Sequence, residues 1–189
     1  MLEGLIITLA ILVTLILILC SWIWGGYNTF IRGTQNVKTM WSDIKTEYQR
    51  RADLLLNLAE AVRSYAKFEK STLVDVIAMR QGKFGNNKME DMKKMKGLEA
   101  FMSKLMVVVE KYPKLLASKQ YQILMHENRI TEDRVNIART NYNDVVRDYN
   151  LTVKSFPSNI LARAFGFNEE NFYENDKETD KAPRLKIDI

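Results

Sequence analysis

The sequence predicts an all-α protein, in which an N-terminal transmembrane helix is followed by an antiparallel helical bundle with long helices. Three observations predict this fold class. No charged residue occurs between Glu3 and Arg32. Two long stretches, 34–81 and 114–156, contain neither glycine nor proline. Within both of them, mainly apolar side chains recur at alternating spacings of four and three residues. Such spacing is typical of helices in bundles and coiled coils. No part of the sequence sustains the alternation of apolar and polar residues that is typical of a strand.

The first element is an apolar run over residues 5–24. About 20 such residues in one helix cross the roughly 30 Å hydrocarbon core of a bilayer. A secretory signal peptide has a basic start, whereas this sequence starts with Met-Leu-Glu. A lipoprotein site has a small residue before its cysteine, whereas Leu19 precedes Cys20 here. We therefore expect a retained, single-pass membrane anchor. The run has no G-x-x-x-G pattern, so it offers no association surface of its own.

Aromatic and basic residues after the run predict how the anchor sits. Trp22, Trp24 and Tyr27 cluster where amphipathic rings favour the headgroup layer, so we assign them to the membrane interface. The first basic residues of the chain are Arg32, Lys38 and Lys45. Because positive charge is retained on the cytoplasmic side, the N-terminus is expected outside and the bundle in the cytoplasm.

Composition divides the chain into three parts: an anchor with its interface over 1–31, a bundle over 32–167, and an acidic, loosely ordered tail over 168–189. The net charge is +5, and the tail contributes −3, which leaves +8 on residues 1–167. This excess suits an anionic bilayer surface or an acidic partner. Nucleic acid is not expected as a partner, because basic and acidic residues are interleaved.

Each long stretch carries one stripe at spacings of four and three. The first comprises Val37, Trp41, Ile44, Tyr48, Arg51, Leu55, Leu58, Val62 and Tyr65. The second comprises Ala117, Tyr121, Leu124, Asn128, Thr131, Val135, Ala138, Tyr142, Val145, Tyr149 and Thr152. Three members are polar: Arg51, Asn128 and Thr131. In one interpretation Arg51 extends its charge to solvent and Asn128 fixes the helix register. In the other they form a buried network with Glu127, Arg134 or Asp53 that lines a site.

Shorter elements are predicted between and after the two stripes. They are a helix from Ser71 or Thr72 to Gln81, a helix from Asn87 to about Lys111, and a short return helix over 158–165. Asn87 and Glu90 resemble a capping pair. Pro113 suits the first turn of the next helix. Pro157 should end the second long helix, and Gly166 should end the return helix.

Catalytic and metal-binding patterns are not found in the sequence. Cys20 is the single cysteine and His126 the single histidine, which excludes a cysteine- and histidine-based zinc or iron–sulfur site. A Glu-x-x-His di-iron motif would need glutamate at position 123, where Ile123 stands. No phosphate-binding glycine loop or nucleophile elbow occurs. We expect no metal, no cofactor and no enzymatic activity.

A charged face beside the tyrosine seam is the candidate surface for self-association. Asp144, Arg147 and Asp148 lie off the seam and carry charges of both signs, which allows complementary contacts between identical subunits. Asn143 and Asn150, one heptad apart, suit either such contacts or plain solvation.

Several collinear motifs resemble the LemA family of bacterial membrane-anchored helical proteins. They are Tyr27-Asn28, Trp41-Ser42, Arg50-Arg51, Asp53-Leu54, Asn57-Leu58, Tyr65-Ala66, Tyr112-Pro113, Glu127 to Ile130, Ala138-Arg139, Tyr142 to Asn150, Phe156 to Ile160 and Phe165 to Phe167. The resemblance implies a helical bundle anchored in a bacterial cytoplasmic membrane, without established enzymatic activity. Magnetosome-forming relatives suggest a role in membrane organisation, and company with membrane zinc peptidases suggests a partner of that kind.

The sequence thus favours a non-enzymatic membrane-anchored scaffold, assembled as a homo-oligomer, that organises the membrane or a membrane protein complex. The alternative is an adaptor or regulatory partner of another membrane protein, such as a membrane zinc peptidase. An enzyme with an unrecognised site is the third class.

Overall fold

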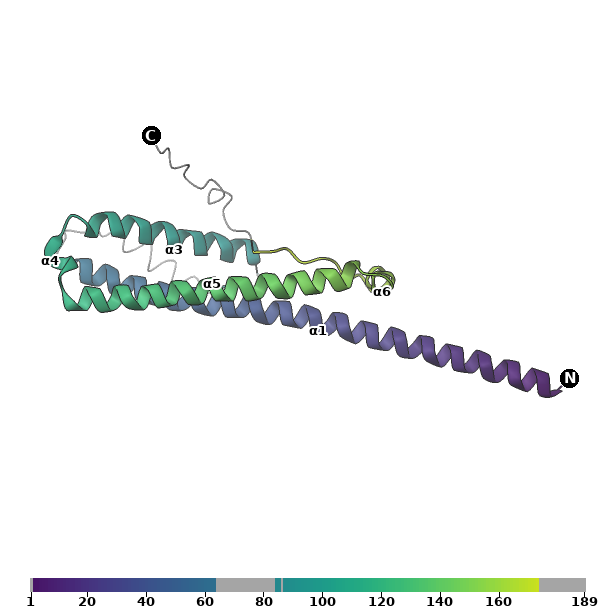
Figure 1. The fold of residues 1–189 in the computed structure, drawn as a ribbon. Helices are drawn as coiled ribbons and strands as arrows, with labels where there is room; N and C mark the ends of the chain where they lie inside the picture. The colour runs from purple at the N-terminus through teal and green to yellow at the C-terminus, as the bar shows by residue number, and fades with distance from the viewer. Residues whose placement is uncertain (1, 64–83, 86, 174–189) are drawn as a thin grey trace, which may run out of the picture. The chain divides into compact units, whose positions relative to one another are not determined.

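The computed structural model describes residues 2–63, 84–85 and 87–173, and confirms the all-α fold class (Figure 1). Its helices are α1 (Leu2–Arg63), α3 (Lys88–Val109), α4 (Pro113–Leu116), α5 (Lys119–Lys154) and α6 (Ser158–Phe165). The chain divides into two compact units. We call Met1–Thr39 with Asn141–Ile189 the terminal unit, and Met40–Thr140 the central unit. Helices α1 and α5 each contribute to both.

Helix α1 is a single unbroken helix of 62 residues, so no linker separates the apolar run from the first stripe. The stripe is buried at every position from Val37 to Val62, and Ile44, Tyr48 and Leu55 are wholly buried. Tyr65, its last predicted member, lies outside the described residues, as does the helix predicted from Ser71 or Thr72 to Gln81.

Close packing in the terminal unit depends on two glycines of α1. A Cβ atom at Gly33 would lie 2.7 Å from the Tyr149 ring of α5, and one at Gly26 would lie 2.4 Å from the Leu161 side chain of α6. Real Cβ atoms do not approach other atoms so closely. The glycines therefore let both α5 and α6 rest directly on the α1 backbone, although glycine is a poor helix former.

The second stripe is buried at seven of its eleven predicted positions, half-buried at Leu124, Val145 and Thr152, and exposed at Ala117. Its buried members are Tyr121, Asn128, Thr131, Val135, Ala138, Tyr142 and Tyr149. Val146, and not the predicted Val145, is fully buried. An α-helix drifts by about 20° per heptad against a strict seven-residue repeat, so the buried face passes to the next residue. Ala117 is exposed and precedes the start of α5.

The predicted helix ends are mostly confirmed. The Asn87 side chain accepts hydrogen bonds from the backbone N–H groups of Met89 and Glu90, at 3.1 and 3.4 Å, and so caps α3. Pro113 is the first residue of α4. Helix α6 spans Ser158–Phe165, and its capping Gly166 has a φ of 75°, in the left-handed region that favours glycine. The Phe156–Pro157 peptide bond is cis.

The first residues of the predicted loose tail are held against α5. The Asn150 side chain donates to the carbonyl of Glu170 and accepts from its N–H, both at 2.9 Å. Asn143 does the same for Tyr173, at 3.3 and 2.8 Å. The Tyr142 hydroxyl donates to the carbonyl of Asn171 at 2.9 Å. Asn143 and Asn150 thus bind their own chain, because a side-chain amide matches the donor and acceptor of one backbone residue.

Candidate functional site

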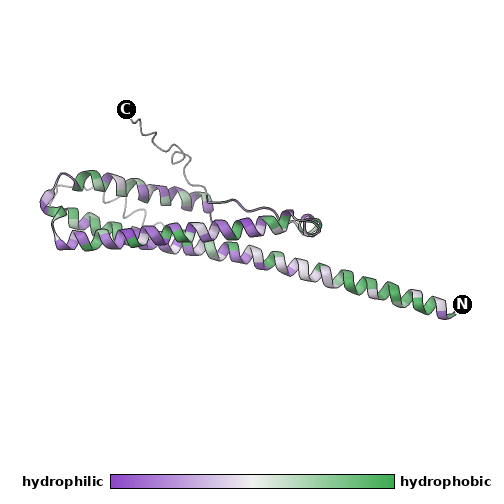
Figure 2. Ribbon diagram, in the orientation of Figure 1, coloured by the Kyte–Doolittle hydropathy of each residue, from purple (hydrophilic) through white to green (hydrophobic). Residues whose placement is uncertain are grey.

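The apolar run of α1 is uncovered by the rest of the protein. Its apolar side chains from Leu2 to Leu19 are exposed, and none of the most apolar window is buried. Figure 2 shows this part of α1 as a continuous hydrophobic stretch. A core helix of a soluble protein would be covered by its neighbours, and this segment is not. By its length and composition, the segment can cross a membrane as a single helix.

An aromatic cluster packs α1 against α6 and the residues after it, just beyond the apolar run of α1. Tyr27 packs edge-on against Phe165 and Phe167, with ring centroids 5.2 and 5.8 Å away. Phe30 stacks on Phe167 at 4.9 Å. Tyr27, one of the three predicted interface residues, thus joins α1 to α6 and to the residues after it. Sequence spacing gave no signal for this contact, because it joins positions far apart in the chain.

Helix α6 extends the exposed apolar surface at this end of the run. Its side chain Ile160 and the preceding Phe156 are exposed, Phe156 by 80%, and on α1 Trp24 is exposed by 76%. Trp22 is also exposed. An apolar cavity of about 510 Å³ lies here and is lined by Cys20, Ile23, Trp24, Tyr27, Asn28 and Phe165. Exposed aromatic rings at the end of an apolar helix are typical of a headgroup layer.

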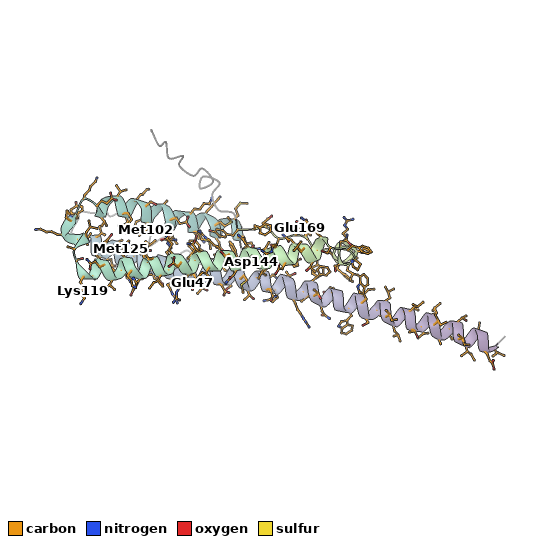
Figure 3. All side chains as sticks on the ribbon, viewed as in Figure 1. Glu47, Met102, Lys119, Met125, Asp144 and Glu169 are labelled. Carbon is orange, nitrogen blue, oxygen red and sulfur yellow. The ribbon has the colours of Figure 1, made fainter. Side chains whose placement is uncertain are left out.

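The candidate self-association residues lie on the exposed side of α5 in the terminal unit. The Arg147 guanidinium is 2.8 Å from the Asp144 carboxylate and 3.4 Å from that of Asp148. All three side chains are at least half exposed. Figure 3 labels Asp144 on α5 and Glu169 in the segment after α6. Exposed ion pairs within one helix contribute about 0.2–0.5 kcal/mol, so Arg147 can exchange them for contacts with another chain.

All three polar members of the stripes are buried, in the central unit. Arg51 is 6% exposed, so it does not extend to solvent as one interpretation expected. Asn128 is 3% exposed. Thr131 is buried, and its hydroxyl donates to the Glu127 carbonyl at 3.0 Å. Of the three partners that the alternative interpretation named, Glu127 and Arg134 are exposed and Asp53 is half-buried, so a buried network with Glu127 or Arg134 is not formed.

A polar cluster that the sequence did not predict joins three helices of the central unit. The Tyr48 hydroxyl on α1 donates to the Glu99 carboxylate on α3 at 2.7 Å. The Arg139 guanidinium on α5 contacts both groups and forms an ion pair with Glu99. These positions are far apart in the chain, so no local spacing signals their meeting. The cluster fixes the three helices in one register.

Metal chemistry has no support in the described residues. Among residues 2–63, 84–85 and 87–173 no group of three or more histidine, cysteine, aspartate or glutamate side chains is placed to hold a metal ion. His126 is exposed on α5. The absence of a metal or cofactor stays a prediction.

Comparison with known proteins gives a family and several relatives. The family model described as LemA family matches residues 40–187. Magnetosome protein MamQ 2 and magnetosome protein MamQ 1 of Paramagnetospirillum magneticum are each 25% identical over 175 residues, covering 78% of this chain. Protein LemA of Metamycoplasma hominis is 25% identical over 142 residues, covering 74%. The chain spans 64% of the length of each of these relatives, and none of them is named as an enzyme.

Proposed function

The chain belongs to the LemA family, and from this premise we propose that it is a non-enzymatic, membrane-anchored scaffold that assembles with copies of itself. The observation that carries the proposal lies within the terminal unit. The same unit contains the apolar run of α1 and the Asp144–Arg147–Asp148 face of α5. A candidate contact face and a membrane anchor are thus parts of one packed body.

The packing of α5 on α1 fixes the distance of that face from the bilayer. Tyr149 meets α1 at Gly33, nine residues beyond Trp24. At a rise of 1.5 Å per residue, this contact lies about 14 Å along the helix from the end of the apolar run. Every copy in the same membrane therefore presents the face at the same height. Confinement to a plane also raises the effective concentration, so weak contacts suffice for assembly.

The names of the relatives suggest what such a scaffold would organise. Two of them are named magnetosome proteins, and by analogy we propose that this chain organises a membrane or a membrane protein complex. The alternative is an adaptor for another membrane protein, such as a zinc peptidase. A scaffold forms contacts between like chains, whereas an adaptor stays a monomer that binds one specific partner.

Site-directed cross-linking in intact membranes tests the proposed face. In a Cys20→Ala background, Leu151→Cys places a thiol one turn from Arg147, at a side chain 55% exposed. A short, membrane-permeant bismaleimide should convert it to dimers. Val107→Cys on α3, exposed by 57%, is the matched control and should stay monomeric. Dimers at position 107 without dimers at position 151 would place the contact elsewhere.

The same thiol tests the proposed orientation. Arg32 and Lys38 are exposed just beyond the apolar run, which favours a cytoplasmic bundle. A membrane-impermeant maleimide should leave Leu151→Cys unlabelled in sealed cells and label it after lysis. Labelling in sealed cells would reverse the orientation while leaving the scaffold proposal standing.

A further inference from the structure

A polar cavity of about 590 Å³ lies within the central unit, between α1, α3 and α5. Arg51 lines it from α1 and Glu99 from α3, while Asn128, Glu132 and Arg139 line it from α5. Apolar wall is contributed by Met102 and Met106 of α3 and Met125 of α5. Figure 3 labels Met102 and Met125 on these two helices. The cavity is separate from the apolar run and from the Asp144–Arg147–Asp148 face, which belong to the terminal unit.

Arg51 is the unusual group in this cavity. Its side chain is more than nine-tenths buried, and its Nε–H is a buried donor without a hydrogen-bond partner among the residues that the structure describes. A guanidinium stays charged at every physiological pH and carries five N–H donors. A buried donor without a partner is unfavourable, so a ligand that accepts a hydrogen bond from this group would bind favourably. A planar guanidinium is best matched by an oxyanion.

Asn128 gives a second, independent indication of a ligand. It too is more than nine-tenths buried and lines the cavity, and its Oδ1 atom has no hydrogen-bond partner among the residues that the structure describes. Buried amides in folded proteins are nearly always hydrogen-bonded. Oδ1 is an acceptor, so it can receive a hydrogen bond from a donor or a water that enters the cavity, and it does not itself bind an anion. Two unpartnered atoms, on two different helices, thus line one space.

The charges around the cavity select the kind of anion. Arg139 is already paired with Glu99, and the charges of Arg129 and Glu132, which also line the cavity, offset each other. The charge of Arg51 is left over, so a monoanion fits better than a dianion. The volume exceeds that of a simple ion, and the three methionines offer a flexible apolar surface. We propose that this cavity binds a small carboxylic acid with an apolar substituent, its carboxylate on Arg51.

Thermal denaturation of the full-length protein in detergent tests the proposal, with hexanoate as the probe. A ligand that binds only the folded state raises the Tm as its concentration passes the Kd. Hexanoate should raise the Tm of the wild type, and the neutral isostere hexanamide should not. Inorganic phosphate, which is largely dianionic at pH 7.5 and has no apolar part, should have little effect. Equal shifts with hexanoate and hexanamide, or with hexanoate and phosphate, would overturn the assignment.

Two variants locate the binding. Arg51→Met removes the charge and keeps an apolar side chain, so the protein without hexanoate should melt at the same temperature or higher. Its affinity for hexanoate should fall by about tenfold to a hundredfold, the loss expected for a charge-assisted hydrogen bond. Arg134→Met, an exposed arginine of α5, is the control and should respond like the wild type. An undiminished hexanoate response in Arg51→Met would overturn the site.

Discussion

Replacing Leu55 with aspartate is expected to abolish the cooperative thermal transition of the central unit. Leu55 is wholly buried in the first stripe. The substitution removes the apolar packing of a leucine and buries a carboxylate, and together these cost on the order of 5 kcal/mol. Domains of this size are stable by about 5–15 kcal/mol, so a loss of this size leaves little folded protein at growth temperature. Far-ultraviolet circular dichroism during heating measures the effect.

Asn57→Asp is the matched control for this change. It introduces the same charge on the same helix, two residues away, at an exposed position. Exposed substitutions usually change the free energy of unfolding by less than about 0.5 kcal/mol. Tyr142→Asp makes the equivalent test in the terminal unit, where Tyr142 is 1% exposed. If Leu55→Asp melts like Asn57→Asp, the assignment of the stripe to the core is wrong.

Replacing Arg147 with glutamate is expected to disperse the proposed assembly and to leave the fold intact. The change places three carboxylates within one turn and lowers the charge of the Asp144–Arg147–Asp148 face by two on every copy. Like charges that meet across an interface oppose association. The Tm should change little, because the lost ion pairs are exposed. Light scattering coupled to gel filtration of detergent-extracted protein measures both assembly mass and homogeneity.

Arg134→Glu serves as the control for charge alone. It makes the same change on an exposed arginine of α5, but in the central unit. It should leave the assembly mass unchanged. Dispersal by Arg134→Glu and Arg147→Glu alike would mean that net charge, and not this face, controls association.

Local patterns in the sequence predicted the helices well, because the information for them is local. The stripe from Val37 to Val62, the Asn87 cap and the Gly166 stop each depend on neighbours within a few residues. The exchange of Val145 for Val146 shows the limit of a strict heptad over a long straight helix.

Contacts between distant positions could not be predicted in this way. The Tyr48–Glu99–Arg139 cluster joins three helices, and each member alone resembles an ordinary seam or surface residue. Asn143 and Asn150 carry the polarity of a solvated face, yet they bind the backbone of the segment after α6. The burial of Arg51 was one of two open interpretations, and only the arrangement of three helices decides between them.

The mass of the wild-type protein in fragments of native membrane tests the central claim most directly. Extraction with a polymer that encloses lipid and protein together avoids detergent, which can separate weak contacts. We expect particles that contain several copies of the 22.0 kDa chain, and a shift of Arg147→Glu to single copies. Single wild-type copies in such particles, at the native expression level, would contradict the scaffold proposal, and single copies together with one other protein would support the adaptor.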